Sequence, residues 1–342
     1  MGMEGVPTIE EYLKDTLKEG EIIGFDGRVV SGTWGNTLLE IAREKNGSLY
    51  VDEDLVDIIW EDRPPMSKAD VMLFDIKYTG RDASDKLADV RNVMKEKGAD
   101  VHLMSSLYDI AWLLNVRGGD ISYVPVVLSY LSITQEDCTW FVQEEVITDE
   151  IRKYLDKYNI STKPYDSFYD YVKTIGKGKK VLMDKSVVNY RICNNIPEGV
   201  EVIDATDPTV FMKAIKNETE LENTRKAHVK DAVAMIKFMY WLKTNVGKMR
   251  ITEISAADYL EELRSQQEGF LDLSFDTICG YAQHGAIVHY AATPETDVEI
   301  KPESFLLVDS GGHYLEGTTD ITRTFAFGEV TDEMTSDFTR VF

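Results

Sequence analysis

Two aspartates near the end of the chain have a spacing that suits metal binding. Asp309 closes the apolar run 305–308, and Asp320 lies within the β-branched run 318–324. Both runs are typical of β-strands. Glycines between the runs favour turn conformations, and they are Gly311, Gly312 and Gly317. We therefore predict a hairpin that places the two aspartates opposite each other, with both carboxylates facing one pocket.

The predicted separation of these carboxylates fits a site for two metal ions. Directly opposed side chains on paired strands lie about 5 Å apart at Cβ. Hydrolytic metal ions about 3.5–4 Å apart need carboxylates at that separation. The geometry is not unique to metal sites. For an arbitrary pair of aspartates, Asp309 as a strand-end turn residue and Asp320 as a solvated strand residue are the ordinary alternative.

A histidine upstream of the aspartates is a candidate for contact with the substrate. His289 lies twenty positions before Asp309, in the run 285–295, which has a β-type composition and contains a proline near its end. Neutral imidazole both donates and accepts hydrogen bonds, so it can orient a peptide carbonyl or stabilise a tetrahedral intermediate. Taken alone, a histidine of this kind is more often structural.

Arg117 is a second candidate for substrate binding. It stands beside two glycines in Arg117-Gly-Gly-Asp120. Glycines let the backbone approach a ligand, and a guanidinium binds a carboxylate well, so the segment could hold the carboxylate of a peptide. A turn with an Arg–Asp pair is an equally good interpretation.

Several segments along nearly the whole chain carry the pattern of one enzyme family. They are 55–64, 110–121, 125–130, 225–233, 252–258, 273–278, 285–295 and 305–327. With them the chain resembles the Xaa-Pro aminopeptidases, also called aminopeptidase P, of peptidase family M24 and of the long, three-domain type. It departs from that family at Tyr108, where an acidic residue is usual, and at Val124, where Asn usually precedes the proline.

The resemblance implies an activity and roles for the candidate residues. Asp309 would ligate one metal ion, Asp320 would bridge two, and the ions would be Mn²⁺ or another divalent metal. His289 would contact the substrate near the scissile bond. The enzyme would remove the N-terminal residue from peptides with proline at the second position, by attack of a hydroxide that two metal ions activate. Members of the family form homodimers.

The end of the sequence limits this interpretation. The family completes its metal site with a later histidine in a glycine-rich stretch and two later glutamates, whereas this sequence stops at Phe342. Mn²⁺ prefers an octahedral, oxygen-rich shell, and two carboxylates fill only part of two such shells. We therefore expect an internal fragment that is nearly inactive by itself. The alternatives are a non-catalytic pita-bread-like module that binds peptides or proteins, and an inert truncated product.

The resemblance also implies a fold of three parts. Residues 1–60 would be the C-terminal remnant of a first creatinase-like domain, 61–206 a second creatinase-like α/β domain, and 207–342 the N-terminal half of a pita-bread peptidase domain. Independently, strand and helix patterns alternate over about 67–206, which predicts an α/β layer fold. Helix-like residues 8–18 and 33–45 flank a strand-like 21–25.

The third segment begins with a clearly marked helix. Asn217 and Glu220 form the Asn-x-x-Glu pattern of a capping box. Apolar residues and one histidine then recur at helical spacing and predict the buried stripe His228, Ala232, Met235, Met239, Leu242 and Val246. We therefore expect His228 to be a packing residue. A second helix over about 254–267 should precede the strands that hold the candidate site.

Composition indicates a soluble intracellular protein. The 342 residues carry a net charge of −23, which disfavours nucleic-acid binding because phosphate neutralisation needs clustered Lys and Arg. The cysteines Cys138, Cys193 and Cys279 are widely separated and form no CxxC pair, as expected in a reducing cytoplasm. The N-terminus lacks the pattern of a signal peptide, and no apolar run approaches the roughly 20 residues that span a bilayer.

Overall fold

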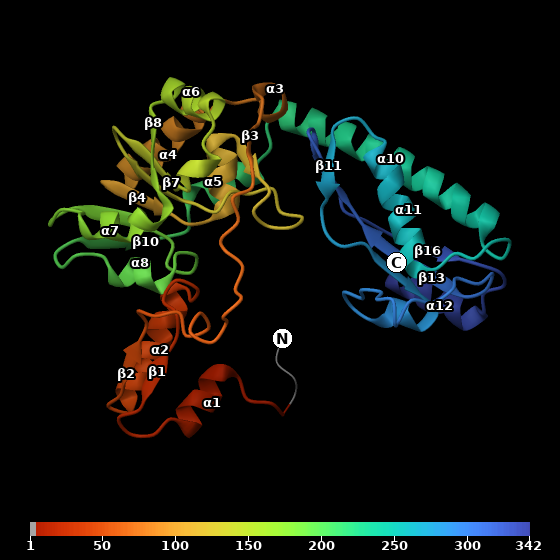
Figure 1. Cartoon of the computed structure of the whole chain (residues 1–342), viewed down its shortest axis with the longest axis horizontal. Helices are drawn as coiled ribbons and strands as arrows, with labels where there is room; N and C mark the ends of the chain where they lie inside the picture. Colours follow the sequence, from red (N-terminus) through yellow and green to blue (C-terminus); the bar gives the residue numbers. More distant parts are fainter. Residues whose placement is uncertain (1–4) are drawn as a thin grey trace. The chain divides into compact units, whose positions relative to one another are not determined.

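The computed structural model describes residues 5–342 and divides them into two compact units (Figure 1). Unit 1 contains the chain up to Phe74, Arg81–Ile121 and Pro125–Ile215. Unit 2 contains Asp75–Gly80, Ser122–Val124 and Lys216–Phe342. The segments 1–60 and 61–206 thus both fall mainly in unit 1, and their division into two domains stays a prediction.

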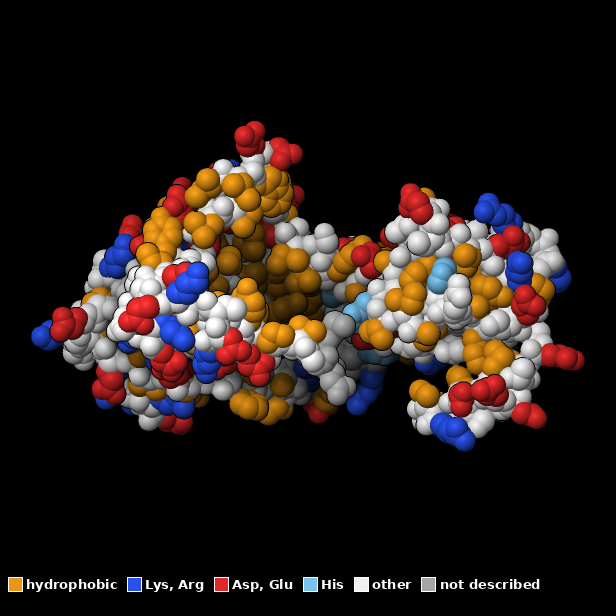
Figure 2. All heavy atoms as spheres, turned by 90° about the horizontal axis from the view of Figure 1, so that it is seen from below, with side chains coloured by type: hydrophobic (Ala, Val, Ile, Leu, Met, Phe, Trp, Pro, Cys, Tyr) orange, Lys and Arg blue, Asp and Glu red, His pale blue; other side chains and the backbone are white. Residues whose placement is uncertain are grey.

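The surface carries the acidic excess in a dispersed form. Figure 2 shows Lys and Arg side chains lying among Asp and Glu side chains on the face that it presents. Within residues 5–342, none of the helices has the length and apolar character that a membrane crossing requires. Cys138, Cys193 and Cys279 are unpaired thiols, two of them buried.

Unit 1 begins with two helices and a small parallel sheet. They are α1 (Ile9–Thr16), β1 (Ile22–Gly24), α2 (Gly32–Glu44) and β2 (Ser48–Tyr50). Thr8 and Glu11 form a capping box at the start of α1, which explains where that helix begins. The two helices and the strand expected in this region are confirmed.

The rest of unit 1 is built around a six-stranded mixed sheet. Its strand order is β10 (Glu201–Asp204), β9 (Lys180–Met183), β4 (Val101–Met104), β6 (Tyr130–Thr134), β7 (Cys138–Val142) and β8 (Ile160–Pro164). The pairs β4–β6 and β6–β7 are antiparallel, and the other pairs are parallel. A two-stranded antiparallel sheet of β3 (Val71–Leu73) and β5 (Val116–Gly118) accompanies it. The predicted α/β layer fold is confirmed.

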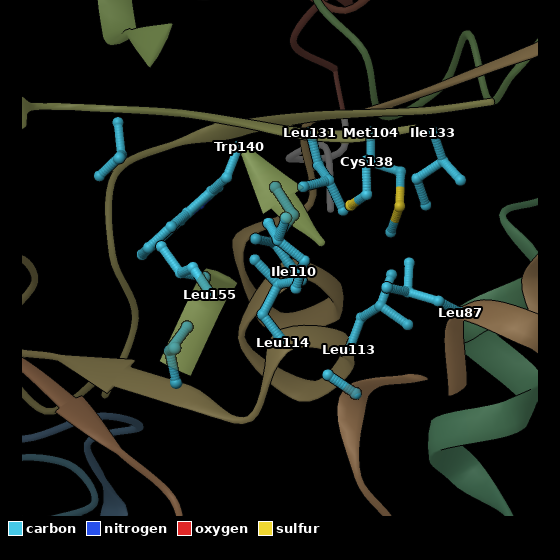
Figure 3. Close-up of a cluster of buried hydrophobic side chains, with 14 of the residues drawn as sticks. Leu87, Met104, Ile110, Leu113, Leu114, Leu131, Ile133, Cys138, Trp140 and Leu155 are labelled. Carbon is cyan, nitrogen blue, oxygen red and sulfur yellow. The ribbon is translucent and has the colours of Figure 1, made fainter. Parts of the chain in front are cut away.

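Several helices accompany this sheet. They are α4 (Ala83–Lys97), α5 (Leu107–Leu114), α6 (Asp149–Lys157), α7 (Phe168–Lys173), α8 (Tyr190–Asn194) and α9 (Pro208–Ala214). Figure 3 shows how one apolar cluster joins α4 and α5 to the sheet, with Leu87 and Ile110 on the helices and Leu131 and Trp140 on the strands. The apolar run 110–114 is therefore packing, as its composition predicts.

One buried ion pair lies inside unit 1. His102 of β4 is fully buried, its Nδ1 donates to the carbonyl oxygen of Leu182 at 3.0 Å, and its Nε2 lies 3.3 Å from Oδ2 of Asp207. Burial alone lowers the pKa of His102, but the nearby Asp207 outweighs it, so that pKa is raised. Burial alone raises the pKa of Asp207, but the nearby His102 outweighs it, so that pKa is lowered.

Unit 2 packs two helices against two small antiparallel sheets. The long helices are α10 (Glu218–Asn245) and α11 (Glu253–Ser265), and short helices are α3 (Ile76–Thr79) and α12 (Asp332–Val341). One sheet has the order β11 (Phe270–Leu273), β14 (Gly312–Tyr314) and β15 (Gly317–Thr318). The other has the order β12 (Ile278–Tyr281), β13 (Phe305–Ser310) and β16 (Ile321–Ala326). Both predicted helices and the capping box at Asn217 are confirmed.

The predicted core face of α10 is confirmed for Met235 and Leu242, which are buried, and for Met239 and Val246, which pack against the core. It was wrong for His228. His228 is exposed, and its Nδ1 lies 2.8 Å from the carbonyl oxygen of Thr224. The buried residues of the helix, which include polar ones that the prediction left out, are Asn223, Ala227, Asp231, Ala234, Met235, Phe238 and Leu242. A search for apolar spacing misses Asn223 and Asp231 because both are polar.

Asp231 is buried because Arg264 neutralises it. Nε of Arg264 on α11 lies 2.7 Å from Oδ1 of Asp231, and Nη2 lies 3.1 Å from Oδ2. The hydroxyl of Tyr314 on β14 donates to the same Oδ1 at 2.9 Å. These three groups join α10 and α11 to β14, the strand that follows β13 in the chain. Such a bidentate pair also fixes the helices in one relative orientation.

We expect Arg264→Met to lower the free energy of unfolding by about 3–5 kcal/mol, because it leaves the buried carboxylate of Asp231 without a counter-charge. The double variant Asp231→Leu/Arg264→Met should recover much of that loss, since no uncompensated charge remains. Urea unfolding measures both. Lys226→Gln, which removes the exposed pair with Glu222 on the same helix, is the control and should change stability by less than about 1 kcal/mol. An Arg264→Met variant as stable as this control would contradict the prediction.

The His102–Asp207 pair predicts a pH dependence of stability. The pKa of His102 is raised on folding. Its contribution to folding stability is therefore complete below about pH 6.5, the pKa in the unfolded chain, and is lost as pH rises through the pKa of the folded protein. The lowered pKa of Asp207 makes its contribution complete above about 3.8, and it is lost as pH falls further. The stability difference between the native protein and His102→Asn should therefore be larger at pH 6 than at pH 9. Chemical unfolding measures the stability difference at each pH. Equal differences at pH 6 and pH 9 would contradict this prediction.

Candidate metal centre

Strand β13 fixes the position of Asp309. It is the central strand of its sheet, paired with β12 on one side and β16 on the other. Leu306 and Val308 are buried in the core of unit 2, whereas Leu307 and Asp309 are half-buried. Because successive side chains of a strand alternate between faces, Asp309 lies on the face opposite the helices.

The predicted direct opposition of the two aspartates was wrong. Asp309 pairs with Thr322, and Asp320 lies just before β16 begins. Continuing the register places Asp320 diagonally across from Asp309 and on the same face, two residues before Thr322. Diagonal neighbours lie about 7–8 Å apart at Cα, within reach of a shared ion or a pair of ions.

The three glycines between the aspartates serve a different purpose from the one predicted. None of them has positive φ, and the turn is made by Leu315 and Glu316, between the paired residues Tyr314 and Gly317. At Gly311 a Cβ atom would lie 2.0 Å from the carbonyl oxygen of Thr319. The glycine therefore permits close approach of the two chain segments that follow Asp309 and precede Asp320.

The environment of Asp309 fits a hard cation. Its Oδ1 is buried and has no hydrogen-bond partner, and a buried carboxylate oxygen without a partner is costly. Asp320 is exposed beside it on the same face. Within residues 5–342, no group of three or more His, Cys, Asp or Glu side chains is arranged to hold an ion. The two aspartates thus supply carboxylate ligands of the right type but form only part of a coordination shell.

His289 does not lie in a strand, contrary to the prediction. Residues Ala282–Ala286 form a 3₁₀ helix, and His289 is an exposed turn residue with a left-handed φ of 56°. The segment folds back over the sheet, since a Cβ at Gly285 would lie 3.6 Å from Cβ of Leu307. Leu307 and Asp309 share a face, so the segment that carries His289 packs on the face that carries Asp309.

Sequence reasoning missed the group that holds this segment. Glu253, the first residue of α11, is fully buried and accepts hydrogen bonds from Tyr281 and Tyr290, with His284 beside it. A glutamate at the start of a helix is usually explained by its favourable interaction with the helix dipole. Nothing in its spacing indicates a buried contact with residues about 30 positions later.

Arg117 lies in unit 1, on β5. Its Nη1 donates to the carbonyl oxygens of Ala111 at 3.0 Å and Val116 at 2.8 Å, and its guanidinium lies 4.4 Å from the ring centre of Phe74. The carboxylate of Asp120 accepts from the backbone N–H groups of Ala69 and Leu128. The role of Arg117 in substrate binding stays a prediction.

Comparison with known protein families covers most of the chain. Residues 62–220 match the creatinase/prolidase N-terminal domain. Residues 222–342, which contain His289, Asp309 and Asp320, match metallopeptidase family M24. Residues 222–342 belong to the M24 metallopeptidase family.

Relatives at moderate identity align along almost the whole chain. A probable Xaa-Pro aminopeptidase P of Sordaria macrospora is 37% identical over 99% of this chain and 58% of its own length. Xaa-Pro aminopeptidase 1 of Dictyostelium discoideum is 37% identical over 98% of this chain and 55% of its own. The chain therefore spans somewhat more than half the length of these relatives.

Solved structures agree with this assignment. The X-prolyl aminopeptidase of Caenorhabditis elegans, described as a cytosolic enzyme with a di-nuclear active site, matches with a TM-score of 0.91 and 30% identity over 97% of this chain and 55% of that one. An Xaa-Pro dipeptidase of Bacillus anthracis matches with a TM-score of 0.58 and 20% identity over 75% of this chain and 69% of that one, which shows the fold alone. The predicted creatinase-like α/β domain followed by pita-bread-type elements is confirmed.

The close approach at Gly311 predicts a strong effect of a single methyl group. Gly311→Ala should displace the backbone between the two aspartates and destabilise unit 2 by about 1–3 kcal/mol, a typical cost of overpacking. Gly176→Ala is the matched control, because a Cβ there meets nothing within 4 Å. Thermal unfolding of both variants measures the effect. Equal melting temperatures would show that the strands separate at no cost.

Proposed function

We propose that the protein acts as a metal-dependent aminopeptidase on peptides with proline at the second position. The observation that carries the proposal is the buried, partnerless Oδ1 of Asp309 on the face shared with Asp320. The names of the relatives supply the substrate class, because they are Xaa-Pro aminopeptidases. We also propose Mn²⁺ as the metal, a homodimer as the assembly and the cytoplasm as the location.

The two aspartates differ in how firmly the fold holds them. Asp309 is fixed by strand pairing on both sides, so its carboxylate would bind an ion with little loss of conformational freedom. Asp320 lies just before β16, the edge strand of the sheet, and is exposed, so its carboxylate would be able to adjust its position to hold an ion. When bound, two such ions would lower the pKa of a water molecule and polarise the scissile carbonyl.

His289 would act on the substrate itself. Its imidazole can donate a hydrogen bond to the oxygen of the scissile carbonyl and stabilise the negative charge that develops there. Such a donor is effective only if it is already in place before the reaction, because its orientation then costs nothing in the transition state. Separately, Arg117 of unit 1 is a candidate to bind a peptide carboxylate by its guanidinium. Its contacts with two backbone carbonyls and Phe74 would orient the side chain for this.

We expect Asp309→Asn and Asp320→Asn each to weaken Mn²⁺ binding at least about tenfold, since losing even a supporting residue of a metal site costs 10–100-fold. Isothermal titration with MnCl₂ measures the affinity, and the rise in melting temperature on adding Mn²⁺ gives a second readout. Asp258→Asn, at an exposed position on α11, is the matched control and should bind Mn²⁺ as the native protein does.

Hydrolysis of an Xaa-Pro peptide by the native protein, with loss of the activity in both aspartate variants, would complete the test. Mn²⁺ binding that is the same in Asp309→Asn, Asp320→Asn and Asp258→Asn would contradict the metal site. Peptide binding without Mn²⁺ binding or cleavage would favour a non-catalytic module.

A further inference from the structure

The segment Ala282–Tyr290, here called the His289 loop, has an unusual backbone at both ends. Ala282 has a φ of 50° and His289 a φ of 56°. A left-handed conformation at a residue other than glycine costs free energy and persists only where the surroundings impose it. The loop therefore needs an anchor that stabilises this conformation.

Glu253 is that anchor. Its Oε1 accepts from the N–H of Tyr281 at 2.7 Å, and its Oε2 accepts from the hydroxyl of Tyr290 at 2.9 Å. Nδ1 of His284 lies 2.9 Å from Oε1. The contacts fall immediately before the loop, within it and at its last residue.

The burial of Glu253 shows that these contacts are its main interactions. Its side chain has no exposed surface. A buried carboxylate is costly unless hydrogen bonds satisfy it, and donors within residues 281–290 do so here. The rings of His284 and Tyr290 also pack on each other, with centres 4.6 Å apart. The two ends of the loop are thereby held together around one carboxylate.

The position of the loop links this anchor to the candidate metal centre. A Cβ at Gly280 would lie 2.9 Å from the backbone of His284, so the loop rests directly on β12. It also contacts Leu307, whose side chain shares a face with Asp309. His289 immediately precedes Tyr290, whose hydroxyl Glu253 holds.

We propose that Glu253 is a positioning residue for His289, and that it acts through Tyr290 and His284 to hold the His289 loop in its left-handed conformation. The inference rests on the proposed function, because it concerns the placement of the substrate-contacting histidine. Glu253 itself does not touch the substrate. Its loss would slow the chemical step while leaving the metal ligands unchanged.

Tyr290→Phe tests the proposal, with Tyr281→Phe as the matched control. Both tyrosines are buried and flank the same loop, but the hydroxyl of Tyr281 donates to the carbonyl of Glu303 at 2.8 Å and not to Glu253. Each variant loses one buried hydroxyl, so both should lose similar global stability. In the native protein with Mn²⁺, Tyr290→Phe should lower kcat on an Xaa-Pro peptide about tenfold with KM changed less than about twofold, because a hydrogen bond to a charged group is lost.

Hydrogen exchange gives a readout independent of activity. Amides of residues 282–290 should exchange about tenfold faster in Tyr290→Phe than in Tyr281→Phe, while the Mn²⁺ affinity of both equals that of the native protein. Glu253→Gln keeps one acceptor oxygen for the N–H of Tyr281, and its amide NH₂ can donate to the hydroxyl of Tyr290, so its kcat should fall less than that of Tyr290→Phe.

The possible failures are distinguishable. Normal cleavage with equal kcat and equal loop exchange in the two tyrosine variants would overturn the role of Glu253 and leave the proposed function standing. Absence of both Mn²⁺ binding and Xaa-Pro cleavage in the native protein would overturn the proposed function, and the positioning role with it.

Discussion

The pairing of β13 on both of its sides is the constraint on which the rest of unit 2 depends. A strand with two partners cannot slip by one residue without reversing which side chains face the core. Leu306 and Val308 are buried against α10 and α11, so Asp309 is forced onto the opposite face. The same register places Asp320, the residue just before β16, on that face and diagonally from Asp309. Hydrophobic burial thus fixes the position of two charged groups that themselves contribute nothing to the core.

The chain segment that follows Asp309 is packed so closely that it tolerates little change. Gly311 lets the backbone after Asp309 approach Thr319, and Ser274 donates to the same carbonyl at 2.9 Å. Beyond this point β14 reaches Tyr314, which joins the buried pair of Asp231 and Arg264. The helices and the hairpin are therefore coupled through one charged cluster. The orientation of the two aspartates is set by groups on both sides of the sheet.

The site combines rigid and adjustable parts. Asp309 is held by the ladder, Asp320 lies at a strand end, and His289 lies in a strained loop whose ends meet at Glu253. Each arrangement suits the task proposed for the residue: a fixed ligand, a bridging ligand and a donor aimed at the substrate. Preorganised donors stabilise developing charge because no reorientation is needed during the reaction.

The sequence by itself determined the elements with local signals and the residues of the candidate site. The helices at 9–16, 32–44, 218–245 and 253–265 follow from caps and periodicity, and the motifs around Asp309, Asp320 and His289 indicate the family.

Tertiary structure decided the rest, because it depends on contacts between distant residues. Only the ladder shows that Asp309 faces Thr322. Asp231 is buried against Arg264 while His228 is exposed, and the β-type run around His289 folds as a loop that is hydrogen-bonded to Glu253. Neither outcome follows from the spacing of the residues. Charged groups that are buried by a distant partner leave no periodic signal in the chain.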